Sequence, residues 1–214
     1  MHESSSELID EVVSRREAIT AGQLLVKAGE PLEQIIAVRS GALKVSLDLE
    51  GEEEQIIGFV LPGELMGLEA LTGERYPYVV EVLEPGSICR FNLSQLDRLE
   101  GRKGEFQQQL ILALGHQARS WQSVPLLMGA KNAERRVALF LLGISSRLVA
   151  HGFPGQRFKL PMSRYCIANY LGLAMETVSR VLKRFQARGL VEVSARRICL
   201  SNLEQLRTIA GIQW

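Results

Sequence analysis

The pattern of apolar and polar positions changes near residue 95. Before this point, short runs rich in Val, Ile and Leu alternate with glycine-containing turns, such as those at Gly41, Gly51 and Gly63. Many short strands at regular spacing are typical of a β-sandwich, jelly roll or barrel. Residues 17–95 are therefore predicted to form an all-β unit, with Gly51 and its acidic neighbours at a hairpin tip.

Beyond residue 95 the apolar residues recur at helical spacing, which predicts a long helix and then a second one over 133–150. The first helix carries a heptad seam, the pattern of helices that pack on a partner helix, and Pro125 is expected to kink or interrupt it. The alternative is packing of the seam on the β-unit of its own chain, but Ile111 and Leu112 lie off the seam and are expected to make that contact instead. The predicted homodimer seam comprises Leu110, Leu114, Gln117, Trp121, Val124 and Met128.

The C-terminal part has the pattern of a helix-turn-helix followed by a β-hairpin. We expect helices over 164–171 and 175–187, joined by a turn where Gly172 adopts a positive φ without a steric penalty. Two helices joined in this way form the DNA-binding unit, although a helical hairpin without DNA has the same outline. Short strands around "SARR" predict a β-wing. The residues expected to face inward are Ile167, Leu171, Leu173, Val178 and Val181, with the small Ala168 where the helices approach.

Charge is distributed unevenly along the chain. Residues 1–100 hold 8 Lys and Arg against 19 Asp and Glu, a net charge of −11. Residues 101–214 hold 17 Lys and Arg against 5 Asp and Glu, a net charge of +12. A basic half indicates a polyanionic partner, although chance clustering is the alternative. We therefore expect double-stranded DNA as the partner.

Composition also argues against other classes of protein. No apolar run approaches the roughly 20 residues that span a bilayer, and the acidic N-terminus lacks the apolar core of a signal peptide, so we expect a cytoplasmic protein without a membrane partner. Cys89, Cys166 and Cys199 are well spaced and form no CxxC, which argues against disulfides. Residues 3–115 contain no histidine, and no phosphate loop or nucleophile elbow is present. We expect neither a metal site of the cupin type nor an enzyme.

The second helix of the helix-turn-helix carries the candidate DNA readers. Side chains three and four residues apart share a helix face, so Glu176, Ser179 and Arg180 are predicted to enter a groove together. Arg donates to O6 and N7 of guanine and Glu accepts from N4 of cytosine, so the pair suits one G·C base pair, with Ser179 on a neighbouring base. The alternative is a surface salt bridge between Glu176 and Arg180, worth only ~0.3–0.5 kcal/mol. Phosphate contacts are predicted for Arg164, Thr177, Lys183, Arg184, Arg188, Arg196 and Arg197.

Four segments, "AVRSGALKV", "EQIIGFVLPGELMGLEAL", "KNAERRVALF" and "NYLGLAMETVSRVLKRFQ", resemble the CRP/FNR superfamily of bacterial transcription regulators, and its FNR branch in particular. The resemblance implies an α+β fold with an N-terminal β-roll like a cyclic-nucleotide-binding jelly roll (1–100), a dimerisation helix (101–130) and a winged helix-turn-helix (131–214). The family's E-x-x-S-R motif falls on Glu176, Ser179 and Arg180, which implies palindromes with TTGAT-type half-sites. It also implies contact with RNA polymerase through an exposed loop, here Gly73, Glu74, Arg75 and Tyr76.

The sequence departs from the family at the effector sites. The FNR cluster needs four thiolates, and only Cys89 matches, because the N-terminal cysteine run is absent. Leu68 replaces the Glu, and residues near Tyr76 and Pro77 replace the Arg-Ser pair, that hold the phosphate of cyclic AMP in the CRP branch. We therefore predict no cofactor and a dimer that needs no effector. The alternatives are gating by a small molecule or haem in the β-roll, a cluster-dependent oxygen sensor, and a module that binds RNA polymerase but not DNA.

The start of the recognition helix departs as well. Relatives have Ser or Thr at the N-cap position, whereas this chain has Ala174. Loss of a cap costs about 1 kcal/mol.

Overall fold

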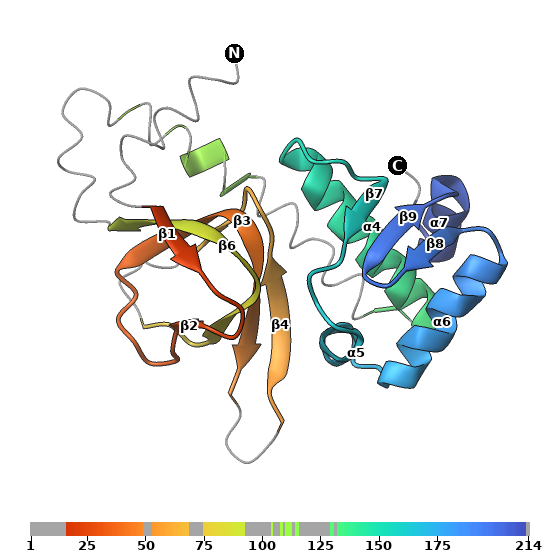
Figure 1. Cartoon of the computed structure of the whole chain (residues 1–214), viewed down its shortest axis with the longest axis horizontal. Coiled ribbons are helices and arrows are strands. Elements are labelled where there is room, and N and C mark those ends of the chain that lie inside the picture. Colours follow the sequence, from red (N-terminus) through yellow and green to blue (C-terminus); the bar gives the residue numbers. More distant parts are fainter. Residues whose placement is uncertain are drawn as a thin grey trace. The chain divides into compact units, whose positions relative to one another are not determined.

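In the computed structural model the chain folds into two compact units, residues 1–118 and 119–214 (Figure 1). No helix in the part of the chain that the structure describes is long and apolar enough to cross a membrane. The described residues are 16–48, 53–68, 75–92, 129, 130 and 132–212, together with the helical residues 104, 108, 110–112, 114 and 115.

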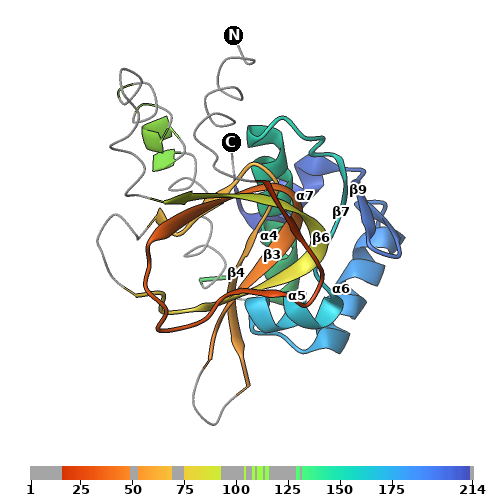
Figure 2. The ribbon, with the colours of Figure 1, turned by 60° about the vertical axis from the view of Figure 1, so that its left-hand side comes forward.

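The first unit contains a rolled sheet, as predicted. Its strands are β1 (Arg16–Ile19), β2 (Leu24–Val26), β3 (Gln34–Leu47), β4 (Gln55–Val60), β5 (Leu65–Met66) and β6 (Val79–Asn92). The order is β1-β6-β3-β4, with β2 also paired to β6 and β5 to β3. The long strands β3 and β6 curve round together (Figure 2), and their inner face supplies the fully buried core residues Ile36, Leu43, Val80 and Ile88.

Two glycines allow β3 and β6 to approach closely where their register shifts. Gly41 has φ +85°, and a Cβ there would lie 2.5 Å from the carbonyl oxygen of Glu84. A Cβ at Gly86 would overlap the carbonyl of Ser40 on the facing strand. Both positions therefore require glycine, one for its backbone conformation and both for space.

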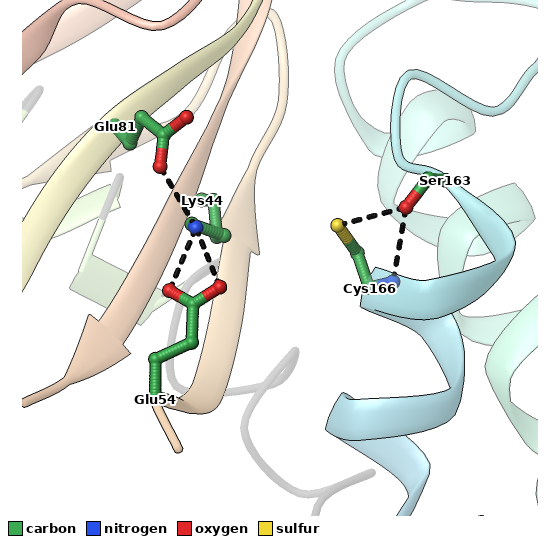
Figure 3. A network of polar contacts seen from close by, with 5 residues as sticks. All are labelled: Lys44, Glu54, Glu81, Ser163 and Cys166. Carbon is green, nitrogen blue, oxygen red and sulfur yellow. Dashed lines mark hydrogen bonds and ion pairs between the residues drawn. The ribbon is translucent and has the colours of Figure 1, made fainter. Parts of the chain in front are cut away.

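Lys44 on β3 is a charged residue buried in this sheet, at 7% exposure (Figure 3). Its Nζ lies 2.7 Å from Glu54 Oε2 and 2.8 Å from Oε2 of Glu81, which pairs with Lys44 across the sheet. Burial opposes the charge of Lys44, but hydrogen bonds and attraction from the two carboxylates outweigh it, so its pKa lies above the ordinary 10.5. The triad ties β3, β6 and the segment before β4 together.

The second unit has helices at the predicted bounds. Its elements are α4 (Ala133–Ala150), β7 (Arg157–Lys159), α5 (Arg164–Leu171), α6 (Met175–Ala187), β8 (Val191–Ser194), β9 (Arg197–Leu200) and α7 (Leu203–Ala210). Strands β7, β9 and β8 form an antiparallel sheet in that order. The helix α7 was not predicted. Helix α4 carries a long buried stretch from Val137 to Leu142 and packs against both α6 and α7.

Candidate nucleic-acid interface

The two helices of the helix-turn-helix, α5 and α6, pack against each other within the second unit. Helix α5 begins at Ser163, whose Oγ accepts a hydrogen bond from the backbone N–H of Cys166 at 3.1 Å (Figure 3). It ends at Gly172, which adopts the left-handed conformation with φ 60° and ψ 44°. The predicted role of Gly172 is confirmed, because a side chain is disfavoured at this φ.

Most of the residues that were predicted to face inward are buried, and the small Ala168 between the helices is among them, at 3% exposure. Leu173 is half-buried, because it lies in the turn rather than on either helix. The buried residues from the predicted set are Ile167, Leu171, Val178 and Val181.

The opposite face of α6 presents the predicted base readers to solvent. Glu176 and Arg180 are exposed, and Ser179 beside them is half-buried. The guanidinium of Arg180 donates to Thr177 Oγ1 at 3.3 Å, whereas Glu176 makes no ion pair with any described residue. The surface salt bridge that was the alternative is therefore not formed, and the carboxylate and the guanidinium both remain available to a ligand.

The basic residues further along α6 differ from one another. Lys183 is exposed and has no charged partner among the described residues. Arg184 and Arg188 both pair with Glu134 of α4: Arg184 Nη1 lies 2.6 Å from Oε1, and Arg188 Nη1 lies 3.2 Å from Oε2. Two predicted phosphate contacts are thus engaged within the protein itself.

The β-wing joins β8 to β9 through a tight turn. Ala195 in this turn has φ 54°, in the left-handed region, and Arg196 and Arg197 follow it on the surface. Arg196 also donates to the carbonyl of Pro161 at 3.2 Å, which holds the wing to the segment before α5. Lys159 of β7 lies opposite Arg197 in the sheet and is exposed, so it extends the basic surface. Lys159 was not predicted, although the alternation of charged and apolar residues along "RFKL" is typical of a strand with one exposed face.

Arg164, another predicted phosphate contact, opens the first turn of α5. It is half-buried, and burial lowers the pKa of its guanidinium. An arginine remains charged despite such a shift, so phosphate contact stays a prediction for Arg164.

Two arginines in the first turn of α4 contact the ends of neighbouring helices. Arg136 Nη1 donates to the carbonyl of Leu171 at 2.9 Å, at the C-terminus of α5. Arg135 Nε donates to the carbonyl of Ala210 at 3.0 Å, at the C-terminus of α7. Positive charge stabilises a helix C-terminus, where carbonyls lack partners, so both arginines act as caps supplied by another helix.

Of the predicted dimer seam, the structure describes Leu110 and Leu114. Leu110 and Leu114 pack on a cluster of the first unit that includes Cys89 and Phe91. Ile111 and Leu112, which were expected to make that contact, are 67% and 53% exposed. The expectation that Ile111 and Leu112 contact the sheet is therefore wrong, because the sheet accepts Leu110 and Leu114, and a role of these two leucines in a dimer stays a prediction. The remaining seam residues, Gln117, Trp121, Val124 and Met128, lie outside the described residues.

The predicted polymerase loop is described only in part, since Gly73 and Glu74 lie outside the described residues. Arg75 is exposed, and its guanidinium donates to the carbonyl of Gly29 at 2.7 Å. Tyr76 is 5% exposed, and its hydroxyl donates to the carbonyl of Gln34 at 2.9 Å. The prediction of Tyr76 as a contact residue is therefore wrong, because its ring is part of the core.

Leu68 and Arg75 lie in the segment that corresponds to the phosphate site of cyclic AMP in the CRP branch. Leu68 is 6% exposed and offers no polar group, and the guanidinium of Arg75 is bonded to backbone. Cys89 is fully buried in an apolar cluster, where a cysteine behaves as a small apolar residue. Cys166 and Cys199 belong to the second unit, and no group of three or more His, Cys, Asp or Glu with metal-binding geometry occurs in the described ranges.

Comparison with known proteins agrees with this architecture. Residues 16–102 match the cyclic nucleotide-binding domain family, and residues 135–209 match the Crp-like helix-turn-helix domain family. The chain is 40% identical to transcriptional activator protein anr of Pseudomonas aeruginosa over 96% of its own length and 84% of that protein. It is 37% identical to the fumarate and nitrate reduction regulatory protein of Vibrio cholerae, covering 99% and 85% of the two chains. Among solved structures, FixK2 of Bradyrhizobium japonicum matches with a TM-score of 0.79 and 30% identity, covering 94% and 98%.

Proposed function

Because this chain belongs to the CRP/FNR family, whose members are transcription regulators and not enzymes, we propose that it binds a palindrome with TTGAT-type half-sites as a homodimer. The observation that carries the proposal is the exposed pair of Glu176 and Arg180 on α6, with Ser179 beside them. Arg180 donates to guanine and Glu176 accepts from the paired cytosine. Lys183 and the wing residues Arg196 and Arg197 contact phosphates.

Fluorescence anisotropy with two duplexes tests this reading. One duplex carries two TTGAT half-sites with centres about 10 base pairs apart, and the other has the G·C pair of each half-site replaced by A·T. We expect the wild type to prefer the first by ~1–3 kcal/mol per half-site, and Arg180→Ala to lose that preference. Lys183→Ala is the control and should weaken binding to both duplexes equally. A wild type that binds the two duplexes equally well would refute the proposed readout.

The dimer contact is assigned to the exposed apolar side of the helical segment around Ile111 and Leu112. Adjacent large apolar side chains exposed on one helix suit a partner helix. Ile111→Glu is expected to convert the dimer to a monomer in sedimentation. Ile57→Glu is the matched control, because Ile57 is an exposed isoleucine of β4 in the same unit. Persistence of the dimer in Ile111→Glu would exclude this surface.

We also propose that DNA binding requires neither an iron–sulfur cluster nor cyclic AMP. The buried Leu68 and the backbone contact of Arg75 support the second part, and the apolar surroundings of Cys89 support the first. Protein purified with and without oxygen should bind the palindrome equally well, with no visible absorbance, and addition of cyclic AMP should leave the affinity unchanged. A chromophore or an oxygen-dependent affinity would overturn the first part.

A second candidate is gating by a small polar molecule in the first unit. An open cavity of about 340 Å³ in this unit is lined in part by Gln34, Tyr76 and Arg90. Arg90 is held there by Glu17 at 2.7 Å. A thermal-shift screen of polar metabolites, with Arg90→Gln as the matched variant, tests this candidate. A hit that shifts both proteins equally would exclude the cavity.

Contact with RNA polymerase is proposed for the loop that contains Glu74 and Arg75, without Tyr76. Glu74→Ala should lower transcription from a promoter with the palindrome in a reconstituted assay while DNA affinity stays unchanged. An unchanged transcript level would exclude Glu74 from the contact.

A further inference from the structure

Glu134 engages two arginines of the recognition helix through separate oxygens. Oε1 accepts from Arg184 and Oε2 accepts from Arg188, with N–O distances of 2.6 and 3.2 Å. The arginine side chains are 58% and 45% exposed, whereas that of Glu134 is 24% exposed. The carboxylate is therefore the less accessible member, and the two guanidinium groups remain open to solvent.

The arrangement has the chemistry of a phosphate contact. Arg184 and Arg188 are four residues apart, at the C-terminal end of α6, and so share one face. Guanidinium groups pair with carboxylate and phosphate oxygens in the same way, through charge-assisted hydrogen bonds. Glu134 thus offers these arginines what a DNA phosphate would offer.

Stabilisation of the fold alone explains the contact of Glu134 with the two arginines less well. Partly exposed ion pairs stabilise a fold by only ~0–1 kcal/mol. Helix α6 is already fixed by Val178 and Phe185, which are fully buried. Glu134 is also one of only four acidic residues in 119–214, so a carboxylate beside these arginines is not explained by a general abundance of acids.

We propose that Glu134 is an internal competitor of DNA phosphates that limits the electrostatic part of DNA binding. In the free protein it holds Arg184 and Arg188, and a phosphate must displace it or share the arginines with it. Phosphate contacts carry no sequence information, so the competition lowers affinity for all duplexes and reduces its dependence on salt. This inference rests on the proposed function, because it takes α6 as the helix that meets DNA.

The size of the effect follows from counterion release. Each neutralised phosphate contributes about −0.9 to the slope of log K against log salt concentration. If loss of the carboxylate frees one arginine for a phosphate, the affinity ratio of variant to wild type falls about 3.5-fold between 50 and 200 mM salt. If both arginines are freed, the ratio falls about 12-fold over the same range.

The test measures the binding of full-length Glu134→Gln to a duplex of random sequence at several salt concentrations. We expect tighter binding at low salt and a slope steeper by about 0.9 to 1.8. Glu204→Gln is the matched control, because Glu204 is exposed and lies in the first turn of α7, as Glu134 lies in the first turn of α4. It removes the same charge from the same unit and should leave the slope unchanged.

Two further variants separate competition from a general charge effect and from misfolding. In an Arg184→Gln, Arg188→Gln background, Glu134→Gln should no longer strengthen binding. Glu134→Asp keeps the charge at the helix N-terminus but shortens the side chain, and it should give a smaller increase in slope. Equal slopes and affinities for wild type and Glu134→Gln, or a gain that persists without the arginines, would overturn the inference. A wild type that binds no duplex would instead remove the proposed function itself.

Discussion

The recognition helix α6 has no side-chain cap at its N-terminus, and Ala174→Ser is predicted to supply one. The other described helices of the second unit begin at Asn132, Ser163 and Asn202, and each of these side chains accepts a backbone hydrogen bond. Ala174 has the extended geometry of a cap residue, with φ −69° and ψ 144°, but offers no side-chain acceptor. Only the acceptor is missing, so the substitution requires no change of backbone.

The expected gain follows from the local geometry. The carbonyl of Ala174 already accepts from Thr177 at 2.9 Å and from Val178 at 3.2 Å, so the helix is closed from the third residue onward. A serine hydroxyl at an N-cap accepts from the second or third helical amide, which belong to Glu176 and Thr177. Ala174 is exposed, so the added oxygen displaces no packed atom. We expect about 1 kcal/mol, or a rise in Tm of about 4–8 °C for a unit of this size.

Calorimetric unfolding of the full chain, with the transition of the second unit followed separately, provides the measurement. Ala187→Ser makes the same substitution at the other end of α6, where the hydroxyl cannot cap, and should lower stability by about 0.5 kcal/mol through helix propensity. Ser163→Ala removes an existing cap and should cost about 1 kcal/mol. An unchanged or lower Tm for Ala174→Ser, with the expected loss in Ser163→Ala, would refute the reasoning.

Three other substitutions probe stability, each measured by urea denaturation. Lys44→Met should lower the free energy of unfolding by about 1–3 kcal/mol, since it leaves two partly exposed carboxylates without their cation. Because the folded-state pKa of Lys44 is raised, this difference should persist below about pH 10 and shrink as the pH rises further; a constant difference at high pH would contradict it. Gly86→Ala should cost about 2 kcal/mol or more through overlap with Ser40, and a neutral result would show that the strands can separate. Arg136→Gln should cost about 1.5–3 kcal/mol by removing the charged donor to Leu171, and wild-type stability would exclude that cap.

The helix boundaries of the second unit were predictable because local chemistry fixes them. Gly172 ends α5 through its left-handed backbone, and Ser163 begins it by accepting a hydrogen bond from the amide of Cys166. The spacing of Val178 and Val181 identifies the buried face of α6 without reference to any other part of the chain. Each of these signals acts within a few residues of the boundary or face that it determines.

The expected contact of Ile111 and Leu112 with the sheet was wrong because that contact depends on distant residues. Apolar side chains occur on both sides of this segment, so heptad spacing alone did not show which side the sheet accepts. The cluster containing Cys89 receives Leu110 and Leu114 and leaves Ile111 and Leu112 exposed. The prediction that Tyr76 contacts RNA polymerase was wrong for a related reason. The residues around Tyr76 are typical of a surface loop, while its own ring is buried.

The same limit applies to the first turn of α4, whose charged residues contact α5, α6 and α7. Glu134 pairs with arginines of α6, Arg135 caps α7 at Ala210, and Arg136 caps α5 at Leu171. All three contacts reach the C-terminal end of a helix that lies 35 or more residues away, so sequence spacing gives no sign of them. Each contact is a charge-assisted hydrogen bond or ion pair, and its strength depends on the relative orientation of donor and acceptor rather than on buried apolar area. Substitution of Glu134 should therefore change DNA binding although Glu134 does not lie on the recognition helix.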